Sequence, residues 1–133
     1  MELLYFAVSW ALVGLIWVIQ LVKYPAFHFV DASRFAEYHL HHEKSITAIV
    51  LPLMVLELVL SFLLGINSNW EIYHLISLII VLAIWLSTFL IQIPIHRILE
   101  NGKDDQAIDQ LVRTNWIRTF LWTLKGILFF LVF

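Results

Sequence analysis

Three histidines are spaced so that they could hold a metal ion or a haem. His39 and His42 are three residues apart, so both lie on one face if their segment is helical. His96 comes from a distant segment and follows Pro94. Neutral imidazole is a ligand of divalent metals and of haem iron. The pattern predicts His39, His42 and His96 as ligands of a divalent metal or a haem. The alternative interpretation is that they are polar residues at a hydrated helix end.

Other residues should join these histidines at the same end of the molecule. Asn115 and Arg118 lie about one helical turn apart, so they share a face and could orient or polarise a carbonyl or phenolate oxygen of a substrate. If the histidines bind no cofactor, they could act as acid and base themselves. Four further residues are predicted to contact a cofactor or a flat, lipophilic ligand: Gln20, Tyr24, Gln92 and Trp122. For Trp122, packing against the core or the lipid is the alternative.

Two charged residues fall deep inside apolar stretches. Glu57 lies thirteen residues after Lys44, and Lys125 lies twelve residues after Arg113, which places both ~20 Å along their helices. Charges at this depth of a bilayer usually face the protein interior and pair. Glu57 and Lys125 are therefore predicted to pair, either as a proton relay that closes a substrate pocket or as a structural ion pair. In a third interpretation, Lys125 extends toward the outer face and leaves Glu57 protonated.

Four apolar stretches must position these residues. Of the 133 residues, 62% are hydrophobic and only 14% are charged, which is far outside the usual composition of soluble domains. Each stretch is close to the ~20 residues that a helix needs to cross a bilayer. The predicted spans are Leu3–Val22, Ser45–Ile66, Ile72–Ile95 and Trp116–Phe133. The predicted fold class is an all-α membrane protein, a four-transmembrane-helix bundle that forms a single domain over residues 1–133.

The distribution of basic residues predicts the orientation. Seven of the eight lie in or beside the first and third loops: Lys23, Arg34, Lys44, Arg97, Lys103, Arg113 and Arg118. The positive-inside rule then places these loops in the cytoplasm and both termini outside, an N-out/C-out topology. Helices two and four should extend into the cytoplasm, because helix-forming residues run without a break from about Ser33 and from Asp104. The first span is expected to be retained as a signal anchor, since no basic segment or cleavage site accompanies it.

Two short segments resemble each other. Ile19-Gln20 precedes Pro25, and Ile91-Gln92 precedes Pro94. Such a pair is what a duplicated helical hairpin would leave behind. Proline removes a backbone donor, so Pro94, and Pro52 in the second span, should kink their helices.

Composition also excludes several classes of function. Without cysteine the chain has no disulfide, thiolate metal site, iron–sulfur cluster or thiol redox centre. Its formal net charge of −2 gives no argument for binding nucleic acid.

One set of residues, spread over essentially the whole chain, carries a resemblance to known proteins: Gln20, Tyr24, Pro25, Phe35, Tyr38, His39, His42, Pro52, Glu57, Pro94, His96, Asn115, Trp116, Arg118 and Thr119. In these positions the chain resembles a family of small four-span bacterial membrane proteins of unknown function. Its short four-helix layout, with Asn115 and Arg118 at the head of the last helix, is also remotely similar to the anthrone-oxygenase-like membrane proteins. Members of that group are associated with oxygenation of polyaromatic substrates. The resemblance implies a multi-pass protein of the bacterial inner (cytoplasmic) membrane.

The sequence therefore predicts a membrane oxidoreductase or oxygenase that acts on a lipophilic small molecule in a His-containing pocket near the cytoplasmic face. Its partners would be the lipid bilayer, that small molecule and, in a homo-oligomer or a larger complex, other protein chains. Two alternatives stay open. A non-enzymatic accessory subunit would present small residues to the lipid, for which Gly14, Ser61 and Gly65 are the candidates. A small proton-coupled transporter built as a dimer would use the buried Glu57.

Overall fold

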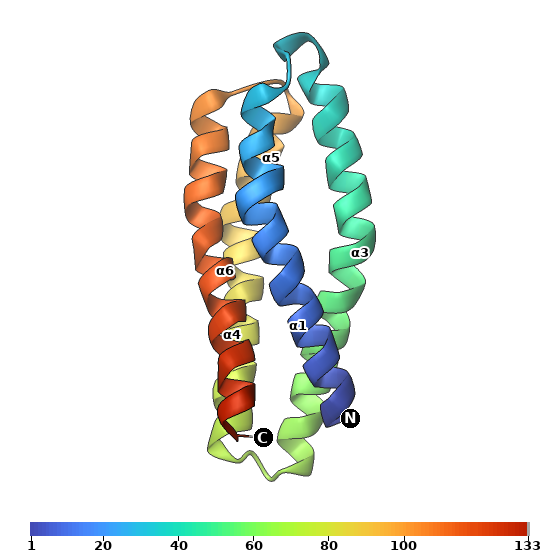
Figure 1. The fold of residues 1–133 in the computed structure, drawn as a ribbon, viewed down its shortest axis with the longest axis vertical. Helices are drawn as coiled ribbons and strands as arrows, with labels where there is room; N and C mark the ends of the chain where they lie inside the picture. Colours follow the sequence, from blue (N-terminus) through green and yellow to red (C-terminus); the bar gives the residue numbers. More distant parts are fainter. Residues whose placement is uncertain (133) are drawn as a thin grey trace.

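The structure is a computed structural model that describes residues 1–132, and it is helical over nearly this whole range. Four long helical segments run alternately up and down, and no strand occurs among the described residues (Figure 1). The first and third segments are interrupted by short π-helical stretches, labelled η1 and η3, and the first ends in a 3-10 turn, η2. In chain order the elements are α1 (Glu2–Val18), η1 (Ile19–Lys23), α2 (Tyr24–Ala26), η2 (Phe27–Phe29), α3 (Ala32–Asn67), α4 (Ile72–Ser87), η3 (Thr88–Gln92), α5 (Ile93–Glu100) and α6 (Asp105–Val132).

Three of the four segments are long and apolar enough to cross a membrane, which supports a membrane protein. Among the described residues these are Glu2–Phe29, Ala32–Asn67 and Ile72–Glu100. The fourth, α6, is not among them, because charged residues recur along it: Asp105, Asp109, Arg113, Arg118 and Lys125. The predicted fourth span ends at Phe133, which lies outside the described residues.

The helix ends agree with the sequence signals. α3 begins at Ala32, one residue before the predicted start, and continues without interruption through Pro52 to Asn67. At the start of α6, the side-chain Oδ1 of Asp104 accepts a hydrogen bond of 2.9 Å from the backbone N–H of Ala107. This contact makes Asp104 the N-cap of α6, and it satisfies one of the free donors of the first turn.

The two π-helical stretches lie just before the prolines of the two similar segments. In η1 the N–H of Tyr24 donates to the carbonyl of Ile19, and in η3 the N–H of Ile93 donates to the carbonyl of Thr88. In both cases the hydrogen bond spans five residues rather than four, and proline follows at the next position. Each segment thus accommodates one extra residue where the proline cannot donate. The prolines therefore act together with a local widening of the helix, which the sequence alone did not predict.

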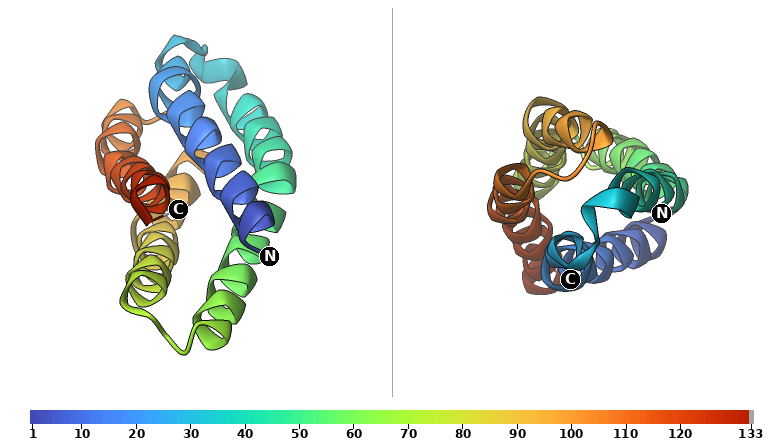
Figure 2. Two further views of the ribbon diagram at one scale, coloured as in Figure 1. Left: turned by 60° about the horizontal axis from the view of Figure 1, so that its bottom comes forward. Right: turned by 90° about the horizontal axis from the view of Figure 1, so that it is seen from above.

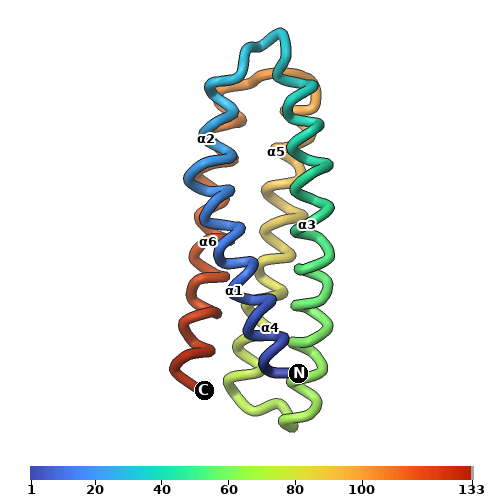
Figure 3. The backbone as a smooth tube through the Cα atoms, turned by 45° about the vertical axis from the view of Figure 1, so that its right-hand side comes forward, coloured from blue at the N-terminus to red at the C-terminus, as the bar shows by residue number. Residues whose placement is uncertain are grey.

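The four segments form a bundle in which each packs against two neighbours. α6 lies between α1 and α4, and α3 lies between the same two on the opposite side (Figure 2). The N-terminus, the end of α6 and the turn between α3 and α4 share one end of the bundle, and the other two turns share the opposite end (Figure 3). The outer faces expose many large apolar side chains, among them Leu3, Leu90 and Leu131. Exposed apolar surface of this extent is what a lipid environment would cover.

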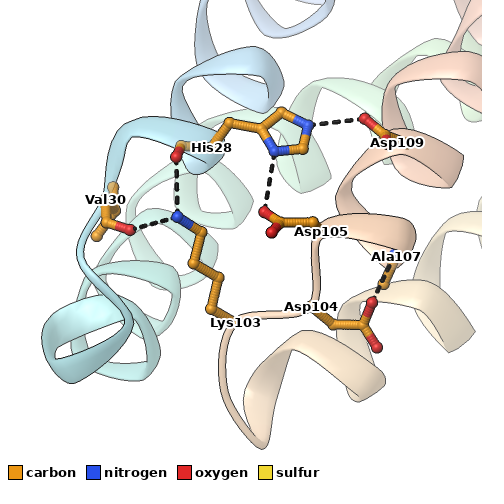
Figure 4. A network of polar contacts seen from close by, with 7 residues as sticks. All are labelled: His28, Val30, Lys103, Asp104, Asp105, Ala107 and Asp109. Atoms are coloured by element: carbon orange, nitrogen blue, oxygen red, sulfur yellow. Dashed lines mark hydrogen bonds and ion pairs between the residues drawn. The ribbon is translucent and has the colours of Figure 1, made fainter.

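The two turns at the end opposite the termini are fastened together by polar contacts (Figure 4). The Lys103 ammonium donates to the backbone carbonyls of His28 and Val30, at 2.8 and 2.9 Å. The His28 ring contacts the carboxylates of Asp105 and Asp109, at 3.2 and 2.8 Å. These contacts join η2 to the start of α6, and so hold the ends of the four segments in a fixed arrangement.

Candidate functional site

The bundle contains a cavity of about 380 Å³ that is partly open to the surface. It lies between α1, α3 and α6 at the level of both π-helical stretches, which contribute Ile19 and Phe89 to its lining. Most of the wall is apolar, for example Leu12 and Met54. The polar lining residues are Tyr24, Glu43, Thr47, Thr88, Gln92, His96 and Arg118. A mostly apolar cavity with a few convergent polar groups is typical of a site for a small molecule.

Arg118 is the centre of the polar lining. It is 6% exposed and donates from Nε and Nη2 to the side-chain oxygen of Asn115, at 2.9 and 2.7 Å. Nη2 also donates to the hydroxyl of Tyr24 at 3.0 Å, and Nη1 donates to the hydroxyl of Thr88 at 3.3 Å. These bonds fix the guanidinium plane, so that Arg118 is held ready to bind a group in the cavity.

Asn115 and Gln20 support Arg118 from behind and do not line the cavity. The side-chain oxygen of Gln20 accepts from Asn115 Nδ2 at 2.9 Å and from the hydroxyl of Thr119 at 3.0 Å, and Gln20 Nε2 donates to the carbonyl of Val112 at 2.9 Å. All three side chains are essentially inaccessible to solvent. The sequence predicted that Asn115 and Gln20 contact a substrate or a cofactor; in the structure Asn115 is bonded to Arg118 and Gln20 is bonded to Asn115. Thr119, which belongs to the residues that carry the family resemblance, was not among the predicted site residues, although it lies one turn from Asn115.

The hydrogen bonds continue from Arg118 to the histidines. The Tyr24 hydroxyl lies 3.1 Å from Nε2 of His96, and Nδ1 of His96 lies 3.0 Å from Nε2 of His39 and 3.1 Å from Oε1 of Glu43. One connected chain of polar groups thus runs from Gln20 in η1 to His39 in α3. Tyr24 and His96, placed near each other by sequence reasoning, are directly bonded in the structure.

Three donor atoms converge at the end of this chain. One ligand atom from each of His39, Glu43 and His96 lies within 4.8 Å of the others. Two imidazoles and one carboxylate are the ligand set of non-haem iron enzymes, and the set also suits zinc or manganese. Glu43 was not identified from the sequence. Its signal was its position four residues after His39, which places it on the same face of α3.

His42 is not part of this group, contrary to the ligand set predicted from the sequence. It is buried, 6% exposed, and its ring packs at 5.1 Å from Phe27 and 6.0 Å from Tyr24. Burial, with a smaller contribution from the charge of His39, lowers the pKa of His42 to about 4, so that it is neutral at physiological pH. Its Nε2 has no hydrogen-bond partner among the described residues. His42 therefore belongs to the aromatic packing around the site.

The ligand geometry suits one metal ion better than a haem. The nitrogen atoms of His39 and His96 lie 3.0 Å apart and face each other, so that a porphyrin has no space between them. Metal-binding histidines usually donate their second N–H to a neighbouring group. His96 meets this condition through Tyr24, whereas Nδ1 of His39 has no partner among residues 1–132.

Glu43 is the one carboxylate in the cavity wall. It precedes Ser45, the first residue of the predicted second span, and its side chain is 29% exposed. Burial raises the pKa of Glu43 to about 7, and the nearby Glu100 adds to this shift. Near neutral pH the carboxyl therefore exchanges a proton readily, a property that acid–base catalysts share.

Glu57 and Lys125 form the predicted pair, but not at the cavity wall. Lys125 Nζ lies 2.5 Å from Glu57 Oε1, and both residues are at most 3% exposed. Trp122 Nε1 donates to Glu57 Oε2 at 3.0 Å, and Lys125 donates to Ser9 Oγ at 2.6 Å. The indole of Trp122 lines the cavity and separates it from the pair. Lys125 does not extend toward the outer face, and Trp122 rather than Glu57 closes the deep end.

Gln92 lines the cavity, as expected for a ligand-contacting residue. Its side-chain oxygen accepts a hydrogen bond of 2.9 Å from Ser87, and its Nε2 donates to the carbonyl of Thr114 at 3.4 Å. Gln92 in η3 and Gln20 in η1 thus hold equivalent places. Each is the buried polar residue of a π-helical stretch, and each bonds to a backbone carbonyl of α6.

Comparison of the chain with protein-family models, with curated proteins and with solved structures found no match. Its class is therefore defined by the structure: an all-helical bundle with three membrane-span candidates and an internal cavity that bears a buried histidine cluster at one end.

Proposed function

We propose that the chain is a four-span protein of the bacterial inner membrane with both termini outside the cytoplasm. α6 would be the fourth span, because it is as long as its neighbours and packs between α1 and α4. Its charged residues do not argue against this: Arg118 faces the cavity and Lys125 pairs with Glu57. Seven of the eight Lys and Arg residues belong to the half of the bundle with the two fastened turns, which the positive-inside rule assigns to the cytoplasm.

We further propose that the protein is a metal-dependent oxidoreductase or oxygenase that acts on a lipophilic molecule inside the bundle. This proposal rests on one observation: the converging donor group and the apolar cavity share residues. Glu43 and His96, two members of the converging donor group, also line the apolar cavity beside Arg118. A metal held by His39, Glu43 and His96 would leave coordination positions open toward a bound substrate.

The residues of the chain have separate roles in this proposal. Arg118 binds an oxygen atom of the substrate and holds that end of the molecule next to the metal ligands. Tyr24 lies between Arg118 and His96, where it can pass a proton. A bound iron ion would supply the electron-transfer or oxygen chemistry that protein side chains without cysteine cannot provide. The apolar walls and Trp122 surround the rest of the substrate.

Fewer features of the structure support the two alternative functions, an accessory subunit and a small proton-coupled transporter. Of the three small residues expected on a lipid-facing interaction surface, Ser61 is buried and the ring of Trp70 covers Gly65, whereas Gly14 is exposed. Glu57, the argument for a dimeric transporter, is 1% exposed and paired within its own chain. The resemblance to the anthrone-oxygenase-like proteins agrees with oxygenase chemistry and stays a proposal.

The test is metal analysis of the protein purified in mild detergent after reconstitution with ferrous iron or zinc. The expected result is one bound ion per chain, lost in His39→Ala and in Glu43→Gln. His42→Ala should keep the ion, and so should His41→Ala, the matched control, since His41 is exposed on the same helix. A protein that binds no ion, or one that loses it in His42→Ala but not in Glu43→Gln, would contradict the proposed site.

A further inference from the structure

Arg118 is a buried cation that no acidic residue of the described chain contacts directly. Within residues 1–132 no carboxylate lies within ion-pair distance of its guanidinium, and its hydrogen bonds go to the neutral side chains of Asn115, Tyr24 and Thr88. The bundle does provide a partner for its other buried cation, because Lys125 pairs with Glu57. The absence of a partner at Arg118 is thus a specific property of the cavity.

Glu43 does not fill this role. It lines the same cavity, but its contact is with Nδ1 of His96, at 3.1 Å. A charge inside an apolar environment is stable only when an opposite charge accompanies it. Arg118 attracts the Glu43 carboxylate without touching it, so no carboxylate of residues 1–132 contacts the guanidinium where it faces the cavity.

The guanidinium also has donor capacity to spare. Arginine carries five N–H groups. Those of Nε and Nη2 are directed at Asn115 and Tyr24, and one of the two on Nη1 is directed at Thr88. The second N–H of Nη1 has no partner among the described residues. A ligand oxygen at this place would receive that hydrogen bond and could accept another from the Tyr24 hydroxyl.

We propose that the natural ligand of the cavity is a lipophilic carboxylate whose carboxyl group binds Arg118 and whose apolar body extends toward Trp122. This deepens the proposed function by naming the substrate class. A carboxylate is ionised at neutral pH, whereas a phenol loses its proton only near pH 10, so the carboxylate brings a negative charge into direct contact with the guanidinium under ordinary conditions. Its two oxygens also match two adjacent donors, Arg118 Nη1 and the Tyr24 hydroxyl.

The size of the cavity limits the ligand to one chain or one ring system. A volume of about 380 Å³ lies near the lower end of the range for small-molecule sites, which is roughly 300–1,000 Å³. Apart from Trp122 at the deep end, the wall beyond Arg118 is formed by apolar side chains such as Ile16, Val50 and Met54. A phospholipid with two acyl chains does not fit this space, whereas a fatty acid or a similar amphiphile does.

The ligand would enter from the bilayer. Three residues that line the cavity are also exposed on the outer surface: Thr47 and Leu51 of α3, and Phe89 of η3. α3 packs against α4 and α5 but hardly against η3, which lies between them. The cavity therefore reaches the lipid-facing surface at this place, where a fatty acid in the membrane already resides.

The experiment compares palmitate with hexadecanol, which has the same chain and an uncharged head. Radiolabelled ligands are bound to the protein in maltoside micelles after removal of metal by a chelator, so that the outcome does not depend on the proposed metal site. We expect palmitate to bind at least tenfold more tightly than hexadecanol. Arg118→Gln should abolish this preference by weakening palmitate binding to the level of hexadecanol, while Arg97→Gln, which removes an exposed arginine at the same end, should keep it.

Equal binding of the two ligands to the native protein would overturn the proposal without any variant, and so would an unchanged preference in Arg118→Gln. If Arg118→Gln does not fold, Arg118→Lys keeps the charge and should keep the preference for palmitate, whereas its loss would overturn the charge argument. A native protein that binds palmitate with the expected preference but binds no metal ion would refute only the proposed metal-dependent chemistry. A native protein that binds the metal ion but does not prefer palmitate would refute the carboxylate ligand and leave the proposed metal site unaffected.

Discussion

Replacement of Lys125 by methionine removes the positive partner of Glu57 with little change in side-chain volume. In the native protein the Glu57 carboxylate is bonded to Lys125 Nζ at 2.5 Å, to Trp122 Nε1 at 3.0 Å and to Ser9 Oγ at 3.4 Å. Loss of one member of a buried ion pair typically costs about 3–5 kcal/mol, because the other charge stays buried and uncompensated. Trp122 and Ser9 continue to donate to Glu57, so we expect a loss near the lower limit, about 3 kcal/mol. This corresponds to a roughly 100-fold change in the unfolding equilibrium constant.

The assay is equilibrium unfolding in mixed micelles, followed by tryptophan fluorescence. The double variant Glu57→Gln/Lys125→Met removes both charges, so we expect it to be more stable than the sum of the single changes predicts, by about 1–3 kcal/mol. Lys44→Met is the matched control, since it removes an exposed lysine, and it should leave the unfolding free energy nearly unchanged. A loss of less than about 1 kcal/mol for Lys125→Met would refute the reasoning. It would mean that Lys125 reaches the outer face instead of pairing with Glu57.

Two further predictions concern the cavity. Because burial raises the folded-state pKa of Glu43 from 4.5 to about 7, the carboxyl stabilises the metal-free protein at low pH and this contribution is lost as the pH rises through 7. Thermal unfolding of the metal-free protein should show lower stability at pH 8 than at pH 6.5. Glu43→Gln should remove this pH dependence. If stability depends on pH in the variant as it does in the native protein, Glu43 is not its cause. Deletion of Leu21, an exposed residue of η1, should restore α-helical pitch and turn Tyr24 by about 100° away from Arg118. Circular dichroism of the deletion variant should then show the native helix content, while palmitate binding is lost. Leu21→Ala, the control, should behave as the native protein. Palmitate binding by the deletion variant would contradict a role for the π-helical stretch.

The helical class and the depth of the polar residues could be predicted because they follow from local rules. The length of the apolar stretches determines which segments can span a bilayer, and the fixed rise of a helix determines depth. For this reason Glu57 and Lys125, although distant in the sequence, were predicted at one level, and the structure pairs them. Whether α6 spans the membrane depends on whether its charged residues have partners, as Lys125 has Glu57. Composition does not reveal such partners.

The arrangement of the site was less predictable, for two physical reasons. The π-helical stretches η1 and η3 shift the faces of their helices, so that a period of 3.6 residues misplaces the side chains beyond them. The choice between His42 and Glu43 as the third member of the donor group depends on how α3 is rotated against α5. His42 packs against Tyr24, whereas Glu43 reaches His96, and one residue along a helix decides between these outcomes.

The pair of Glu57 and Lys125 also has a consequence for biosynthesis. The two residues are separated by 68 positions, so that α3 is complete long before Lys125 has been made. At a rate of about 5–20 residues per second, the ribosome needs roughly 3–14 seconds to cover this distance. During that interval the carboxyl of α3 lacks the cation that pairs with it in the finished protein. The arrival of α6 supplies that cation, so the pair forms only after nearly the whole chain has been made.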